Sequence, residues 1–165
     1  MLPVQRRFLI VEHGIGTALI NVAVNGIIAG LLFQNLETVP LWGWISIAGD
    51  TLSTTFLLPL LLCLIATPLA RREVRNGRIP PLERRRAGHW YFRWLPASDR
   101  LRAVTLGFIC LLFLGPVTIL GFTLFSVSSL PFWSFIAYKS LFAGLLAGLL
   151  GPLVGTWAIV RFSDG

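Results

Sequence analysis

The segment RREVRNGRIPPLERRRAGHWYFRWLPASDRLR, residues 71–102, contains ten of the fourteen Lys and Arg residues of this 165-residue chain. It separates two of four long apolar stretches. Arg6 and Arg7 precede the first stretch, and Arg161 follows the last. Thirteen basic residues therefore occupy three segments that alternate with pairs of apolar stretches. This arrangement is typical of a protein that crosses a membrane several times.

The two remaining connections differ in charge from the basic segments. Residues 34–49 and 126–131 contain neither Lys nor Arg. Because basic residues collect on the cytoplasmic side of membrane proteins, the alternation predicts that both termini and the basic loop 71–102 lie in the cytoplasm. The expected topology is four spans, N-in and C-in.

Composition indicates the same class by a separate route. With 55% hydrophobic residues, 13% charged residues and a mean hydropathy of +0.77, the chain has too little polar surface to cover a soluble globule. Each apolar stretch exceeds the roughly 20 residues needed to cross a bilayer core. We predict one all-α integral membrane domain over residues 1–165, a four-transmembrane-helix bundle. Its spans are placed at about 8–33, 48–70, 103–127 and 132–160.

The net charge of +7 would suggest nucleic acid as a partner in a soluble protein. Here most of that charge lies in one loop beside predicted spans, so anionic lipid headgroups at the cytoplasmic face are the expected partner, and nucleic acid is not. The arginines expected to contact headgroups are Arg71, Arg72, Arg84, Arg85 and Arg86. We expect a multi-pass protein of the bacterial inner (plasma) membrane.

Polar residues inside the spans are the candidates for function, because their transfer into lipid is costly. Asp50 and Lys139 both lie about 30 Å from the cytoplasmic ends of their spans, at about 1.5 Å per residue. They can form an ion pair at the outer end of a polar pocket with Asn25, Thr51 and Thr54. Two structural explanations compete: Lys139 can extend to the headgroups, and Asp50 can stabilise a helix N-terminus.

A polar stripe runs along the first span. His13, Thr17, Asn21 and Asn25 recur every four residues and therefore share one helix face, and Glu12 adjoins them. As a functional element, the stripe lines an ion or solute path, with His13 and Glu12 exchanging protons. As a structural element, the asparagines hydrogen-bond a neighbouring helix. We favour this interhelical bond for Asn21.

Prolines interrupt three spans at a similar depth. Pro59, Pro116 and Pro152 each remove a helical hydrogen bond and are predicted to kink their helices. The freed carbonyls can coordinate a cation, or Thr55 and Thr118 can satisfy them. The third and fourth spans share a Gly-Pro step, but too little else matches to indicate an internal repeat.

Small residues repeat along one face of the fourth span, and such a face lets two helices approach closely. Gly107, Gly115 and Gly121 make the third span a candidate mate, and the spacing leaves open whether the partner belongs to the same chain or to another. The residues of the small face are Ala143, Gly144, Ala147, Gly148, Gly151 and Gly155.

No nucleophile elbow, metal-ligand cluster or phosphate-binding loop is present, so an enzyme is not expected and the sequence identifies no cofactor. The polar spans favour a small transporter or channel for an ion or small solute. Because four helices enclose little volume, this function predicts a homo-oligomer or a large groove that faces lipid. The alternative is a non-catalytic accessory or scaffold subunit of a larger membrane complex that docks through its glycine face.

Overall fold

The computed structural model describes residues 3–78, 80, 96 and 98–163 of the chain. In this part, four helices are long and apolar enough to cross a membrane: Val4–Leu32, Ile47–Arg75, Asp99–Leu124 and Phe132–Val160. The prediction of a mostly helical chain with four helices long and apolar enough to cross a membrane is therefore confirmed, and the fold fits a multi-pass membrane protein. The side of the membrane on which the termini lie stays a prediction.

The first helix is continuous but not uniform. It comprises α1 (Pro3–Arg7), the π-helix η1 (Phe8–Gly16) and α2 (Thr17–Leu32). Gly14 and Gly16 lie in the π-helical part, and their low helix propensity makes a regular α-helix less favourable there. Such wide turns are frequent at functional sites, and nothing in the hydrophobic pattern predicted one here.

The other three helices follow the predicted spans with shifted ends. Helix α3 (Ile47–Arg75) begins after Ser46, whose Oγ accepts a hydrogen bond from the backbone N–H of Gly49 at 3.1 Å. Its last turns include Arg71 and Arg72, which the sequence placed in the loop. Helices α5 (Asp99–Leu124) and α6 (Phe132–Ser163) complete the set.

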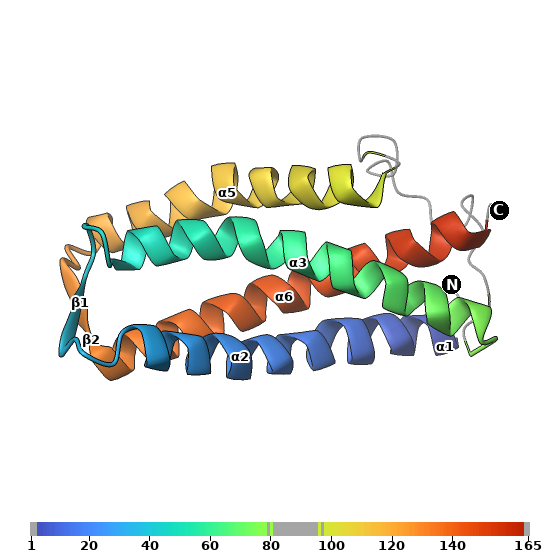
Figure 1. Ribbon diagram of the computed structural model, residues 1–165, viewed down its shortest axis with the longest axis horizontal. Helices are drawn as coiled ribbons and strands as arrows, with labels where there is room; N and C mark the ends of the chain where they lie inside the picture. Colours follow the sequence, from blue (N-terminus) through green and yellow to red (C-terminus); the bar gives the residue numbers. More distant parts are fainter. Residues whose placement is uncertain (1–2, 79, 81–95, 97, 164–165) are drawn as a thin grey trace.

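A short pair of strands joins the two connections at the end of the molecule opposite the termini (Figure 1). Strand β1 (Thr38–Pro40) pairs antiparallel with β2 (Ser129–Pro131), and Val39 lies opposite Leu130. Val39 is fully buried. Periodicity did not predict these strands, because three residues are too few to show an alternation.

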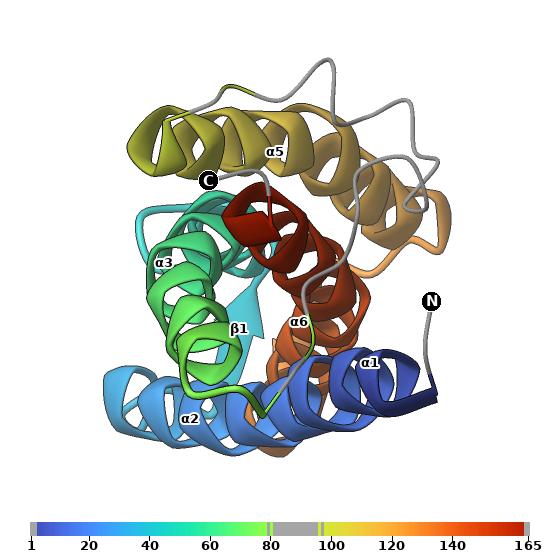
Figure 2. The same cartoon turned by 90° about the vertical axis from the view of Figure 1, so that its right-hand side faces the viewer.

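Helices α3 and α6 form the centre of the molecule. Helix α5 packs along α3 on one side, and α2 packs along α6 on the other (Figures 1 and 2). In the most apolar 18-residue stretch of α6, 67% is buried within the molecule, whereas in the corresponding stretch of the first helix 6% is buried. The first helix therefore has a single extensive helix contact and leaves most of its surface for other interactions.

The four glycines of the small face of α6 pack against the first helix, so the prediction that they mate with the third span is wrong. A side chain at Gly151 would collide with the backbone carbonyl of His13, and one at Gly144 would collide with Val22. Gly148 and Gly155 likewise face the first helix. Small-residue spacing identifies a close-packed face but carries no information about which helix covers it.

Two of the three glycines of α5 face α3 instead. A Cβ at Gly107 would lie 2.9 Å from the carbonyl oxygen of Phe56, and one at Gly115 would lie 2.7 Å from the Leu52 side chain. Gly121 faces open space. Ala143 and Ala147 of α6 are fully buried in the core cluster shared by α3, α5 and α6.

Candidate functional site

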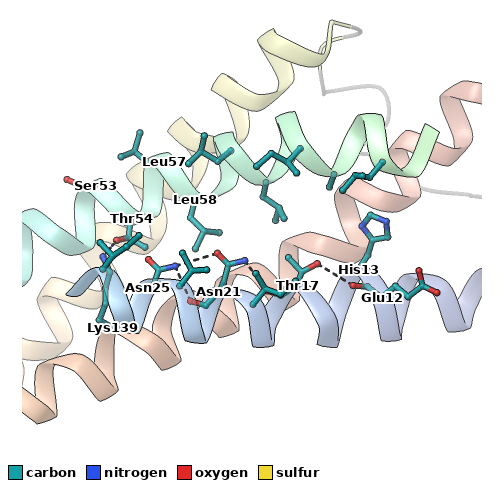
Figure 3. Close-up of a pocket in the computed structure, with 18 of the residues that line it drawn as sticks. Glu12, His13, Thr17, Asn21, Asn25, Ser53, Thr54, Leu57, Leu58 and Lys139 are labelled. Atoms are coloured by element: carbon teal, nitrogen blue, oxygen red, sulfur yellow. Dashed lines mark hydrogen bonds between the residues drawn. The ribbon is translucent and has the colours of Figure 1, made fainter. Parts of the chain in front are cut away.

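A groove of about 780 Å³ lies between the first helix and α3, and Lys139 of α6 closes one end (Figure 3). It contains all eight residues proposed for an ion or solute path. Its described lining residues are Phe8, Glu12, His13, Thr17, Ile20, Asn21, Val24, Asn25, Ile28, Leu32, Asp50, Ser53, Thr54, Leu57, Leu58, Leu61, Leu62, Ile65, Ala66, Leu69, Glu73 and Lys139.

The polar wall of the groove belongs to the first helix, and its side chains bond backward along that helix. Asn21 Nδ2 donates to the Thr17 carbonyl at 2.9 Å, and Asn25 Nδ2 donates to the Asn21 carbonyl at 3.1 Å. Thr17 Oγ1 donates to the Glu12 carbonyl at 3.4 Å. The interhelical bond favoured for Asn21 is therefore wrong, because α3 lies across the groove (Figure 3).

These local bonds leave polar capacity in the groove. A primary amide has two N–H donors and a carbonyl acceptor, and the backbone bond of Asn21 or Asn25 uses one donor. Asn21 Oδ1 also accepts from Asn25 Nδ2 at 3.5 Å, so the second N–H of Asn21 and the carbonyl of Asn25 are the groups left for the groove. Both side chains are half-buried on the groove side of the helix. Over the roughly 12 Å from Thr17 to Asn25, the wall presents hydroxyl and amide groups to whatever fills the groove.

The π-helix positions the other end of this wall. His13 is buried, and its ring meets the Phe8 ring edge to face with centroids 4.8 Å apart. Its backbone carbonyl packs against Gly151, which brings α6 close to η1. Glu12 has an exposed side chain at the groove margin. The two ionisable residues thus lie together, as the predicted path requires.

The opposite wall comes from α3, and its middle part is apolar. Leu57, Leu61 and Ile65 recur at four-residue spacing along it, with Leu58 and Leu62 beside them. Leu57, Leu61 and Ile65 are 49%, 51% and 58% exposed, so the groove is open on its side. In a bilayer this opening faces the acyl chains. The groove is therefore amphipathic, and it was invisible in the sequence because leucine in a span normally indicates only lipid contact.

An ion pair closes the groove at the end nearer the strands. Lys139 Nζ lies 2.6 Å from both carboxylate oxygens of Asp50 and 2.5 Å from Thr54 Oγ1. The Lys139 and Asp50 side chains are 6% and 12% exposed. The predicted ion pair is confirmed, and Lys139 points into the bundle rather than toward a headgroup. Next to it, Thr51 Oγ1 and Tyr138 OH share a 2.7 Å hydrogen bond.

The prolines lie inside helices but away from the groove. Pro59, Pro116 and Pro152 are not among the described residues that line it. Pro152 lies against Gly14 of the π-helix. Thr55 Oγ1 donates to the Leu52 carbonyl, and Thr118 Oγ1 donates to the Leu114 carbonyl. Neither carbonyl lies four residues before a proline, so neither is a carbonyl that a proline frees. Ligand coordination by freed carbonyls therefore stays an untested prediction.

A second polar cluster ties α3, α5 and α6 together at the other end of the molecule. Arg102 is 1% exposed, and its Nη2 lies 2.8 Å from Asp99 Oδ1 and 3.3 Å from Thr67 Oγ1. Its guanidinium carbon stands 3.1 Å from the centre of the Trp157 ring. Arg71 pairs with the other Asp99 oxygen at 2.6 Å. Sequence reasoning missed this cluster because Arg102 was one arginine among ten.

The predicted headgroup contacts divide accordingly. Arg71 is engaged by Asp99, whereas Arg72 is exposed at the end of α3. Arg84, Arg85 and Arg86 lie outside the described residues. Contact of these arginines with anionic lipid stays a prediction.

Comparison of the chain with models of protein families, with curated proteins and with solved structures found no match in any of the three.

Proposed function

We propose that the protein is a small membrane transporter in which the groove between the first helix and α3 is the path of a small solute. The polar part of the solute follows the wall of Thr17, Asn21 and Asn25, and its apolar part contacts the leucines of α3 or the surrounding lipid. The ion pair of Asp50 and Lys139 and the pair of Glu12 and His13 stand at the two ends of this path.

The observation that carries the proposal is the incomplete hydrogen bonding of the Asn21 and Asn25 side chains. Each amide donates to a carbonyl one turn back on its own helix, and Asn21 Oδ1 accepts from Asn25 Nδ2 at 3.5 Å. Among the described residues, the second N–H of Asn21 and the side-chain carbonyl of Asn25 have no hydrogen bond, and both lie in a groove that opens to lipid. Amides facing hydrocarbon without partners are costly, so a passive membrane anchor has no reason to place them there. A solute or water that lies along the wall satisfies them.

The accessory-subunit alternative has less support. It relied on the glycine face of α6 for docking, and the first helix of the same chain already covers Gly144, Gly148 and Gly151. Other exposed apolar faces are expected of any helix surface that contacts lipid. We expect self-association to supply the remaining enclosure of the groove, and the mass of the intact assembly in native lipid reports the oligomeric state.

Purification in native lipid followed by native mass spectrometry tests the proposal while the solute is still unidentified. We expect the wild-type protein to retain a small molecule that Asn21→Leu loses. The matched control is Thr118→Val, which removes a side-chain bond to the preceding helical turn, as Asn21→Leu does, but on α5 away from the groove. The released molecule is then assayed for flux in vesicles. Identical bound species in all three proteins would contradict the proposal.

A further inference from the structure

The starts of the two central helices have related sequences. Residues 44–51 read WISIAGDT and residues 133–140 read WSFIAYKS, with Trp, Ile and Ala at matching positions and a hydroxyl residue at the end of each. In this alignment Asp50 corresponds to Lys139. The two residues that form the buried ion pair, 89 positions apart, are thus equivalent to each other.

The strands repeat the relation one step earlier in the chain. Residues 38–42 read TVPLW and residues 129–133 read SLPFW, and the equivalent residues Val39 and Leu130 face each other in the antiparallel pair. The two alignments differ by two residues because WGW at 42–44 corresponds to the single Trp133. Gly43, with a φ of +136°, belongs to this insertion in the first connection.

Backbone hydrogen bonds beside the strands are reciprocal. The Leu41 N–H donates to the Ser128 carbonyl at 2.8 Å, and the Phe132 N–H donates to the Glu37 carbonyl at 3.0 Å. Leu41 is equivalent to Phe132, and Glu37 is equivalent to Ser128. Exchange of the two halves therefore converts one bond into the other, which is the property of contacts related by a two-fold axis.

The helix packing obeys the same exchange. It turns the contact of α2 with α6 into that of α5 with α3, and it maps α3 onto α6 in the centre, as the end view in Figure 2 shows. The register agrees within two residues: Gly26 packs on Ser140, equivalent to a contact of 117 with 51, and the structure has Gly115 on Leu52. The last turns of α5 depart from the symmetry, since Gly121 faces open space.

We infer that residues 16–70 and 107–159 are two copies of one helix–strand–helix unit, packed about a pseudo-two-fold axis that passes between Asp50 and Lys139. The copies are interlocked, because the first helix of each lies on the second helix of the other. This repeat relates span one to span three and span two to span four. The sequence alone did not reveal it, since the Gly-Pro step drew attention to spans three and four instead.

The ion pair then selects which units associate. At a two-fold axis, two identical units would place two carboxylates or two ammonium groups against each other with little solvent to screen them. Opposite charges at the equivalent position favour the pairing of the first unit with the second and oppose the pairing of like units. Asp50 and Lys139 are therefore the specificity residues of the interface between the units.

The copies differ most along the groove. If the proposed function holds, the polar side wall of the path comes from the first unit, whereas the second unit contributes Lys139 at one end. Asn21→Leu installs the amino acid that the second unit carries at the equivalent position. The counterparts of Thr17, Asn21 and Asn25 are Phe108, Leu112 and Pro116.

Disulfide formation in the full chain tests the axis. In a background with Cys63→Ala and Cys110→Ala, we expect the pair Val39→Cys and Leu130→Cys to close efficiently in the membrane. The pair Thr38→Cys and Ser129→Cys is the control, because these equivalent residues face each other only if the units are related by translation. A missing 39–130 disulfide, or an equally efficient 38–129 disulfide, overturns the inference.

Charge exchange tests the equivalence of the two positions. Asp50→Lys and Lys139→Asp each place like charges at the axis, and each is expected to lose most of the folded protein in detergent. The double variant Asp50→Lys/Lys139→Asp is expected to recover at least half of the wild-type yield. Recovery no better than that of the worse single variant overturns the inference. Neither experiment involves the solute, so the proposed function can fail while the repeat stands.

Discussion

Removal of one partner from the buried ion pair should destabilise the protein far more than removal of a surface pair. In Lys139→Met, the Asp50 carboxylate stays 12% exposed and loses contacts of 2.6 Å to both of its oxygens. Breaking a buried pair on one side costs about 3–5 kcal/mol. At about 2–4 °C per kcal/mol for a chain of this size, the melting temperature should fall by roughly 6–20 °C.

Thermal unfolding in detergent, followed by the folded peak on size exclusion, measures this change. The double variant Asp50→Leu/Lys139→Met removes both charges and should be more stable than Lys139→Met alone, because no buried charge is left unpaired. The control is Arg78→Met, which breaks an exposed 3.4 Å pair with Glu73 and should cost at most about 1 kcal/mol. The reasoning is refuted if Lys139→Met costs no more than Arg78→Met, or if the double variant is the least stable.

Two further substitutions probe the packing of the helices. Gly151→Leu should abolish the folded peak on size exclusion because its side chain meets the His13 carbonyl, whereas Gly121→Leu, with no atom within 4 Å, should leave the peak unchanged; equal peaks would contradict the placement of the first helix. Arg102→Lys should lose about 2 kcal/mol in thermal unfolding, because an ammonium group cannot reproduce the planar contact with Trp157 while binding Asp99. The exposed Arg100→Lys should change stability by less than about 0.5 kcal/mol, and similar losses at both positions would count against the cluster.

Some contacts of the polar and small residues could be predicted from the sequence, and others could not. The ion pair of Asp50 and Lys139 was predicted because the helical rise per residue gives the depth of each residue in its span. Two opposite charges at the same depth in a membrane are expected to pair. The interhelical hydrogen bond predicted for Asn21 was wrong because a polar stripe can either contact a neighbouring helix or line a groove. Only the position of the neighbouring helix distinguishes the two arrangements. The small face of α6 was recognised as a packing surface, but its partner was not, since first-helix and α5 residues offer similar apolar cover.

The linear pattern of apolar length and arginine placement determined that the chain is helical, that it has four spans, and which polar residues lie within them. Each of these properties depends on whether a segment lies in lipid or in water, and the composition of the segment itself decides this. The tertiary structure alone decided the order of helices and the amphipathic groove. These depend on which apolar faces fit most closely, and lipid, being as apolar as the helices themselves, leaves that choice to shape and to a few polar contacts.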